Sequence, residues 1–230
     1  MGAAIEISAV IVAAGRGQRL GSSLPKAYIS LGGKPILEYS LELFARCAQV
    51  SEIIVVIHPD DERLFQKLSL ALEKPWQRVY GGAHRQDSVL TGVRAAHGDY
   101  VLVHDGARPC VSLSLVERVI ETMKEHGTAV PVVPIAESVK RVKEDQIVSD
   151  EDRSMLFCAQ TPQGFTRKLL TEALERAYAQ GRYFTDEASV VLAMSGVQPR
   201  AIPGEAQNIK ITTEADLKLA ECWLTARRAS

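Results

Sequence analysis

Short apolar runs alternate with longer amphipathic stretches along the first half of the chain. The apolar runs, which predict strands, occupy residues 8–14, 51–58, 78–82 and 99–105. The amphipathic stretches, which predict helices, occupy residues 36–47, 60–74, 85–96 and 114–127. Strands buried on both faces appear as continuous apolar runs, and strands that alternate with helices usually pair in parallel. The pattern therefore predicts an α/β fold with a twisted, mostly parallel sheet flanked by helices.

Residues 131–165 depart from this alternation. The segment contains extended runs on either side of a polar turn, KEDQ at 143–146, and it shows no helical period. This pattern predicts a protruding β-hairpin arm at about residues 136–159. Because a two-stranded hairpin has too little core to be stable alone, we expect the arm to pack on a second copy of the chain in a homodimer.

Helical patterns return after the arm. We expect helices at 167–180 and from about 185–189, a strand within 198–204, and a last helix from Thr213 onward. Asp60 and Ser114 stand where N-caps of the earlier helices are expected, and Gly127 follows the last turn of its helix. No linker or repeat interrupts the pattern, so residues 1–230 are predicted to form a single domain that carries the arm.

Charge and cysteine content narrow the class of protein. Lys and Arg number 27, Asp and Glu number 28, and the two signs are interspersed, which argues against bulk binding to nucleic acid or anionic lipid. No segment approaches the ~18 apolar residues of a membrane span, and the N-terminus lacks a signal-peptide pattern. The four cysteines lie far apart without a C-x-x-C pair, which predicts buried free thiols rather than disulfides or zinc ligands. We therefore expect a cytoplasmic protein.

A glycine-containing loop follows the first predicted strand, at residues 13–26. Ligands of open α/β sheets bind beyond the carboxyl ends of the strands, which is where this loop is expected. Gly15 and Gly17 allow the backbone to approach a bound group closely and to direct N–H donors toward it. The loop is therefore a candidate site for an anionic ligand.

Two common glycine-loop sites do not fit this loop. A dinucleotide site needs G-x-G-x-x-G leading into a helix, but Gly21 comes one residue late and Pro25 interrupts a helix. The P-loop motif G-x-x-x-x-G-K-[ST] is absent. A nucleoside triphosphate cradle fits better, with Arg19 and Lys26 supplying positive charge and Arg16 interpreted as a solvated cation. Nucleotidyl transfer to an ionised phosphate needs charge neutralisation rather than an acid or base.

Seven motifs occur in order along nearly the whole chain: AAGRGQRL, PKAY, GGAHRQDSV, VLVHDGARP, TPQGF, TDEAS and NIKIT. In this order they closely resemble the 2-C-methyl-D-erythritol 4-phosphate cytidylyltransferases of isoprenoid biosynthesis. The resemblance implies a nucleotidyltransferase fold and the conversion of CTP and methylerythritol phosphate to 4-diphosphocytidyl-methylerythritol and pyrophosphate. It also implies Mg²⁺, bound mainly through the CTP phosphates without a dedicated protein metal site, and a homodimer whose arms interlock.

The resemblance implies three overlapping sets of site residues. The catalytic set, which stabilises the transition state and positions the acceptor phosphate, is Arg19, Lys26, Arg153 and Lys210. The nucleotide-binding set is Ala13, Ala14, Gly15, Gly17, Gly82, Ser88, Asp105 and Gly106. The set that binds the sugar phosphate is Asp105, Arg108, Ser138, Arg153, Thr161, Thr185 and Lys210.

Several of these residues also have ordinary structural interpretations. Asp105, which ends a strand, could accept hydrogen bonds from substrate or help hold magnesium, but it could also cap a turn. Thr185 suits a helix N-cap, Arg153 a surface ion pair and Lys210 a solvated cation. His104 is predicted to be packed rather than a metal ligand, since no second ligand stands at suitable spacing.

Three positions depart from the usual family pattern. Val12 stands where many relatives have proline, Ser138 replaces the usual threonine, and Ala83 stands where some members carry aspartate. These differences alter loop stiffness and side-chain contacts, and they leave backbone contacts to a base available.

Three other functions compete with this one. A ribitol 5-phosphate cytidylyltransferase would share most of the motifs and differ in its acceptor. A nicotinamide-dependent oxidoreductase is disfavoured, because no acidic ribose partner ends the second strand, where Ile57, His58 and Pro59 stand. A noncatalytic nucleotide-binding module would not need the cations Arg19, Lys26 and Lys210, all of which are present.

Overall fold

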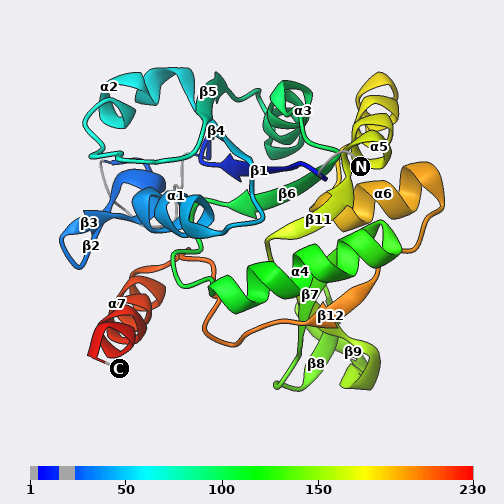
Figure 1. The fold of residues 1–230 in the computed structure, drawn as a ribbon. Coiled ribbons are helices and arrows are strands. Elements are labelled where there is room, and N and C mark those ends of the chain that lie inside the picture. Colours follow the sequence, from blue (N-terminus) through cyan, green and yellow to red (C-terminus); the bar gives the residue numbers. More distant parts are fainter. Residues whose placement is uncertain (1–4, 16–23, 230) are drawn as a thin grey trace.

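A mixed, mostly parallel sheet forms the centre of the molecule in the computed structural model, which describes residues 5–15 and 24–229 (Figure 1). The strand order is β10-β7-β11-β6-β1-β4-β5, and β12 pairs with β7. The strands of this sheet are β1 (Ile7–Val12), β4 (Glu52–Ile57), β5 (Trp76–Tyr80), β6 (Tyr100–Asp105), β7 (Thr128–Pro134), β10 (Phe157–Ala159), β11 (Gln163–Thr166) and β12 (Ala201–Pro203).

Parallel pairing prevails where the sequence predicted it. Strand β1 pairs in parallel with both β4 and β6, and β4 pairs in parallel with β5. The antiparallel strand β11 separates β6 from β7. The predicted α/β class with a mostly parallel sheet is therefore confirmed.

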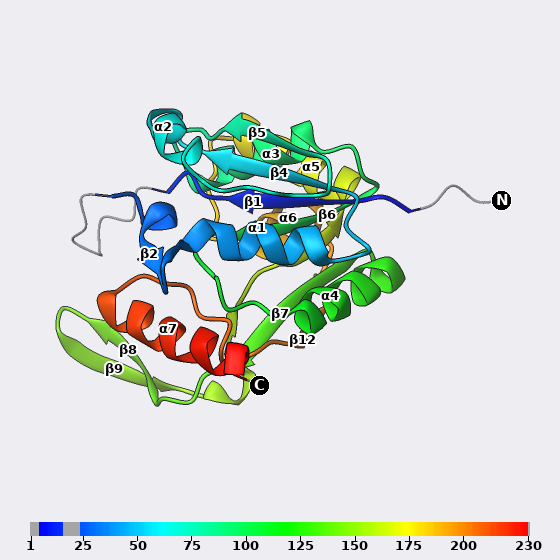
Figure 2. The ribbon, with the colours of Figure 1, turned by 60° about the vertical axis from the view of Figure 1, so that its left-hand side comes forward.

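Helices cover both faces of the sheet (Figures 1 and 2). The α-helices are α1 (Ile36–Arg46), α2 (Glu62–Phe65), α3 (Arg85–Ala95), α4 (Leu113–His126), α5 (Arg167–Ala179), α6 (Glu187–Ser195) and α7 (Glu214–Ala229). Side chains of α1 and α4 share one buried cluster, and side chains of α3, α5 and α6 share another. Strand β1 contributes Ile7, Ala9 and Ile11 to the first cluster and Val10 and Val12 to the second. This alternation is the period of two expected of a strand with both faces covered.

The predicted helix at 60–74 is wrong beyond its first turns. A 3₁₀ turn η3 (Pro59–Asp61) leads into the short helix α2, which ends at Phe65. Leu68, Leu70 and Leu72 then pack at every second residue against the core, in a segment without regular secondary structure. Tertiary packing of alternate leucines therefore overrides the helical propensity of this stretch.

The two predicted N-caps, Asp60 and Ser114, are wrong. Ser112 rather than Ser114 caps α4, since its Oγ accepts a hydrogen bond from the Leu115 N–H at 3.0 Å. His58 rather than Asp60 caps η3, because its Nδ1 accepts from the Asp60 N–H at 3.1 Å. The predicted end of α4 at Gly127 is confirmed, with φ +77° in the left-handed region that favours glycine.

The cysteine prediction is half right. Cys47 and Cys110 are buried free thiols as expected, whereas Cys158 and Cys222 are exposed free thiols. Cys158 lies on β10, which pairs only with β7 at the edge of the sheet, and Cys222 lies on α7. An apolar neighbourhood in sequence therefore did not ensure burial at an edge strand or on a peripheral helix.

A separate hairpin forms within the segment predicted to be an arm. Strand β8 (Val139–Lys143) pairs antiparallel with β9 (Gln146–Glu151) in a sheet of their own. The turn residues Glu144 and Asp145 both have positive φ, as in the tight turns that match strand twist. The hairpin extends away from the central sheet (Figure 2), and its packing on a second copy of the chain remains a prediction.

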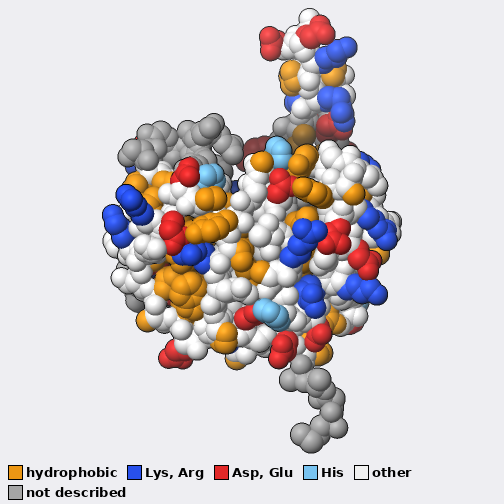
Figure 3. Space-filling view, turned by 90° about the horizontal axis from the view of Figure 1, so that it is seen from above, with side chains coloured by type: hydrophobic (Ala, Val, Ile, Leu, Met, Phe, Trp, Pro, Cys, Tyr) orange, Lys and Arg blue, Asp and Glu red, His pale blue; other side chains and the backbone are white. Residues whose placement is uncertain are grey.

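Surface charge follows the composition. Figure 3 shows Lys and Arg side chains interspersed with Asp and Glu side chains over one face of the molecule, without a large patch of one sign.

A second antiparallel pair, β2 (Ser30–Leu31) with β3 (Lys34–Pro35), lies before α1. Within the described chain, no helix is both long enough and apolar enough to cross a bilayer.

Candidate active site

A cavity of about 300 Å³ opens where β1 and β6 end and α3 begins. This is the carboxyl edge of the parallel strands, where ligands of open α/β sheets bind. Its described lining is Val12, Ala13, Ala14, Gly15, Lys26, Ala27, His58, Gly82, Ala83, His84, Arg85, Ser88, Asp105, Ala107 and Lys210. Eight residues of the predicted site sets therefore meet in one cavity: Ala13, Ala14, Gly15, Lys26, Gly82, Ser88, Asp105 and Lys210.

Backbone segments approach each other closely on one side of this cavity, where the predicted nucleotide-binding residues Ala13, Ala14 and Ser88 lie. This side is called the nucleotide side. The Ala13 N–H donates to the Val56 carbonyl at 2.7 Å, which continues the sheet beyond β1. A Cβ atom on Gly81 would lie 2.5 Å from Ser88 Oγ and 2.6 Å from Ala14 Cβ, so only glycine allows this approach. The loop after β5, the end of β1 and the first turns of α3 thus form one wall.

Lys26 is placed in the cavity by a short 3₁₀ turn, η2 (Lys26–Tyr28). Pro25 precedes it with φ −59°, and the Tyr28 N–H closes the turn onto the Pro25 carbonyl at 2.9 Å. Tyr28 is buried in the core cluster beneath α1. Burial of Tyr28 therefore anchors the turn while Lys26 lies at the cavity.

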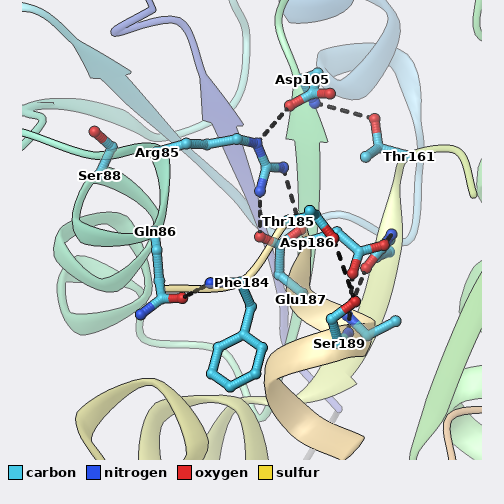
Figure 4. Close-up of polar contacts among 12 residues, drawn as sticks. Arg85, Gln86, Ser88, Asp105, Thr161, Phe184, Thr185, Asp186, Glu187 and Ser189 are labelled. Atoms are coloured by element: carbon cyan, nitrogen blue, oxygen red, sulfur yellow. Dashed lines mark hydrogen bonds and ion pairs between the residues drawn. The ribbon is translucent and has the colours of Figure 1, made fainter. Parts of the chain in front are cut away.

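Asp105 is the centre of the charged network in the cavity (Figure 4). Its Oδ1 lies 3.0 Å from Arg85 Nε, and its Oδ2 lies 2.8 Å from Lys210 Nζ. Burial alone would raise the pKa of Asp105, but Arg85, Lys210 and Arg108 more than offset it and hold the pKa well below its usual range. The carboxylate is therefore ionised at neutral pH.

The end of β6 is held by hydrogen bonds among His104, Thr161 and Arg108, on the side of Asp105 away from the cavity. The buried hydroxyl of Thr161 accepts a hydrogen bond from the Asp105 N–H at 3.0 Å and lies 3.1 Å from His104 Nδ1. Burial lowers the pKa of His104 to about 3, so the ring is neutral. Its Nε2 faces the Arg108 carbonyl at 3.3 Å, which places the ring hydrogen on Nε2 and lets Thr161 donate to Nδ1. As predicted, His104 is a packed residue.

Several predicted site residues do not line the described cavity. Thr161 and Arg108 lie behind Asp105, and Arg108 donates from Nη1 to the Asn208 carbonyl at 2.8 Å. Gly106 packs under the cavity, with its N–H donating to the Val12 carbonyl at 2.9 Å. Thr185 is exposed just before α6, and its hydroxyl lies 3.4 Å from Ser189 Oγ. The N-cap of α6 is Asp186, not Thr185, since Asp186 Oδ1 accepts from the Ser189 N–H at 2.9 Å.

The remaining predicted residues belong to other parts of the chain. Ser138 and Arg153 are exposed beside the β8–β9 hairpin, where Arg153 Nη1 donates to the Ala136 carbonyl. Neither residue lines the described cavity of its own chain. Arg16, Gly17 and Arg19 lie outside the described residues.

The oxygen donors of the cavity could bind a metal ion only if a bound ligand supplied further oxygens. Asp105 is the one carboxylate among the described lining residues, and three or more His, Cys, Asp or Glu do not come together anywhere in the described chain. Mg²⁺ commonly takes one or two protein carboxylates and completes its shell with phosphate oxygens and water. The cavity fits that arrangement and does not fit a cage of several side chains.

Comparison with known proteins identifies the family. The family model described as "IspD: 2-C-methyl-D-erythritol 4-phosphate cytidylyltransferase" matches residues 7–226. The chain belongs to the IspD family. The predicted resemblance is therefore confirmed, and the dinucleotide-binding oxidoreductase is not supported.

Curated relatives and solved structures agree with membership of IspD. The chain is 41% identical over 227 residues to the 2-C-methyl-D-erythritol 4-phosphate cytidylyltransferase of Escherichia fergusonii, covering 96% of this chain and 94% of that protein. It is 43% identical over 219 residues to the bifunctional enzyme IspD/IspF of Rhodospirillum rubrum, covering 94% of this chain and 56% of that protein. The chain thus spans about half the length of the bifunctional relatives that it matches.

Solved structures of IspD proteins share the fold. The 2-C-methyl-D-erythritol 4-phosphate cytidylyltransferase of Thermus thermophilus superposes with a TM-score of 0.79 at 35% identity, covering 95% of this chain and 98% of that chain. The 4-diphosphocytidyl-2C-methyl-D-erythritol synthase of Anaerococcus prevotii superposes with a TM-score of 0.84 at 30% identity, covering 96% and 97%.

Seven lining residues of the IspD cavity were in none of the predicted site sets, and Arg85 is the one among them that pairs with Asp105. Arg85 lies within the GGAHRQDSV motif, but no role was predicted for it. Its guanidinium bonds to Asp105 and to Glu187, which is 102 positions away in sequence. An arginine at the start of a predicted helix gives no sign in the sequence of partners so far along the chain.

Proposed function

We propose that this chain transfers CMP from CTP to 2-C-methyl-D-erythritol 4-phosphate, giving 4-diphosphocytidyl-2-C-methyl-D-erythritol and pyrophosphate. The observation that carries the proposal is the cavity at the carboxyl ends of β1 and β6, which holds Lys26, Lys210 and Asp105 in an IspD-family chain. A basic cavity of this kind suits a triphosphate, and its position suits a nucleotide.

The chemistry needs charge stabilisation more than proton transfer. A phosphate oxygen of the acceptor attacks the α-phosphorus of CTP, a new P–O bond forms, and the bond to the bridging oxygen breaks so that pyrophosphate leaves. Negative charge grows on the leaving group, and a fixed ammonium group beside it stabilises it. Lys26 is assigned this role together with Arg19, which lies outside the described residues.

Lys210 is assigned to the phosphate of the acceptor. Its side chain is 36% exposed, and its Nζ pairs with Asp105 at 2.8 Å. A partly exposed lysine can exchange one anionic partner for another without the large desolvation cost of a buried ion. Lys210 would therefore turn from Asp105 toward a phosphate when substrate enters.

The nucleotide side of the cavity suits a cytosine base. Ala13, Ala14, Gly15 and Gly82 present backbone at the wall. The Ser88 hydroxyl donates to the His84 carbonyl at 3.1 Å, so its oxygen lone pairs remain available to accept from an exocyclic amino group. A hydrogen-bond-accepting hydroxyl at Ser88 favours cytosine, which has an amino group, over a base that has a carbonyl at the same position.

Magnesium is proposed as the cofactor, held mainly by the triphosphate. Asp105 would supply the protein oxygen, in keeping with its ionised state and its place in the lining. When bound, Mg²⁺ neutralises part of the phosphate charge. Arg108, Thr161 and Gly106 support the Asp105 strand end, while Ser138, Arg153 and Thr185 remain assigned to the sugar phosphate on the strength of their motif positions.

A homodimer through the hairpin is part of the proposal. Strands β8 and β9 pair only with each other among the described strands, and Val142, Ile147 and Val148 on them are exposed apolar residues. A two-stranded ribbon with exposed apolar side chains gains stability by packing on a partner.

The function is tested by pyrophosphate release from CTP and Mg²⁺ with two acceptors assayed side by side. Release with methylerythritol 4-phosphate and little with ribitol 5-phosphate is the expected result. Release with ribitol 5-phosphate alone would assign the chain to another polyol phosphate, and no release with either acceptor would remove the catalytic assignment of Lys26 and Lys210.

A further inference from the structure

Arg85, the first residue of α3, connects two buried carboxylates on different elements. Its Nε lies 3.0 Å from Asp105 Oδ1 at the end of β6. Its Nη1 and Nη2 lie 2.6 Å and 3.2 Å from the two carboxylate oxygens of Glu187, in the first turn of α6. Figure 4 shows the guanidinium between the two carboxylates.

The two oxygens of Asp105 have partners of different character. Arg85 holds Oδ1 from the cavity wall, and its other contacts are with Glu187, which is only 2% exposed. Lys210 holds Oδ2 from a side chain that is 36% exposed. Arg108 Nε also lies 3.7 Å from Oδ2, from a side chain that is largely buried. Arg85 and Arg108 therefore remain beside Asp105 when Lys210 moves to a phosphate, and Arg85 is the one that also contacts Glu187.

The start of α3 also fixes the segment that leads into α6. Gln86 Nε2 donates to the Arg182 carbonyl at 3.0 Å, and Gln86 Oε1 accepts from the Phe184 N–H at 3.0 Å. Together with the Arg85–Glu187 pair, these bonds attach residues 182–187 to α3 at three points. Thr185, assigned to the acceptor, lies inside this segment.

We propose that Arg85 is a positioning residue for the transfer reaction, which holds the Asp105 carboxylate at the cavity and ties it to the start of α6. The inference rests on the proposed function. Arg85 lines the cavity, but Nε and both terminal nitrogens contact carboxylates, and the proposed role is therefore to hold Asp105. A lysine cannot replace it, because only the planar fork reaches both carboxylates at once.

The test is a double-mutant cycle on pyrophosphate release, with Arg85→Gln, Asp105→Asn and the combined variant. Arg85→Gln is expected to lower kcat/KM on the order of 10-fold to 100-fold, mostly in kcat, because a displaced carboxylate spoils the geometry of the bound phosphates. In the Asp105→Asn background, the same substitution is expected to change kcat/KM by about twofold or less.

Arg94→Gln is the matched control. Arg94 lies on the same helix and pairs with Glu175 at 2.9 Å in an exposed salt bridge, so its loss is expected to leave kcat and KM unchanged. Arg85→Lys guards against misfolding, because it retains the positive charge beside Glu187. It is expected to keep the circular dichroism spectrum of the parent and still lose roughly 10-fold in kcat.

The outcomes separate this inference from the proposed function. Activity of the parent chain together with non-additive Arg85 and Asp105 effects supports the inference. An active parent with additive effects, or a fully active Arg85→Lys variant, overturns the positioning role and leaves the proposed function intact. An inactive parent chain removes both.

Discussion

At the residue scale, the site depends on charges held around one carboxylate. Asp105 has cations on both oxygens, and its backbone is fixed by Thr161 and a neutral His104. The motifs predicted that Lys26, Lys210 and Asp105 belong to one site, because motif order identifies a family. The contacts of Arg85 with Asp105 and Glu187 could not be predicted, since the start of α3, the end of β6 and the start of α6 come together only in the folded chain.

Lys26→Ala is expected to lower kcat on the order of 10²-fold, because removal of one preorganised charge donor typically has this effect. The fold should persist, since Lys26 lies at the cavity while buried Tyr28 anchors the turn. Steady-state pyrophosphate release measures the effect. Lys218→Ala, on the exposed face of α7, is the control and should retain parental turnover; an equally active Lys26→Ala would refute the role of Lys26.

For helices and strands, the periodicity of apolar residues predicted most elements. Where a prediction was wrong, tertiary packing explains the difference. The periodic stretch at 114–127 became α4, because its apolar stripe faces the core. The stretch at 60–74 has a similar composition, yet the core takes Leu68, Leu70 and Leu72 at every second residue. Local periodicity cannot distinguish these cases when leucines suit both spacings.

Ser112→Ala is expected to lower the free energy of unfolding by about 1 kcal/mol, because it removes the N-cap of α4. Ser114→Ala is the matched control, two residues further on the same helix, and should change stability by less than about 0.5 kcal/mol. Urea unfolding followed by circular dichroism compares the two. Equal losses would contradict the placement of the cap.

At the scale of the whole molecule, the β8–β9 hairpin is the feature that points beyond one chain. The sequence predicted the hairpin because extended runs surround a polar turn, and β8 and β9 form there. Single-chain packing cannot explain its exposed apolar residues. Val142 and Ile147 are direct cross-strand partners, 59% and 68% exposed. A paired apolar patch of this kind is suited to bury against a second copy.

A Val142→Asp, Ile147→Asp double variant is expected to shift the chain from dimer to monomer, since two charges would be buried in the interface without partners. Sedimentation velocity measures the mass of each species. Val197→Asp, at an exposed apolar residue in the loop between α6 and β12, is the control and should leave the mass unchanged. A parent chain that sediments as a monomer would contradict the arm-mediated dimer.

In the proposed reaction, a new phosphoanhydride bond joins CMP to the acceptor phosphate. Phosphorus NMR of a mixture of the protein, CTP, Mg²⁺ and methylerythritol 4-phosphate tests it directly. If CMP is transferred, diphosphate-diester resonances grow in step with pyrophosphate, while the acceptor monoester resonance falls by the same amount. Pyrophosphate that accompanies free CMP, with the acceptor resonance unchanged, would show hydrolysis and would rule out transfer.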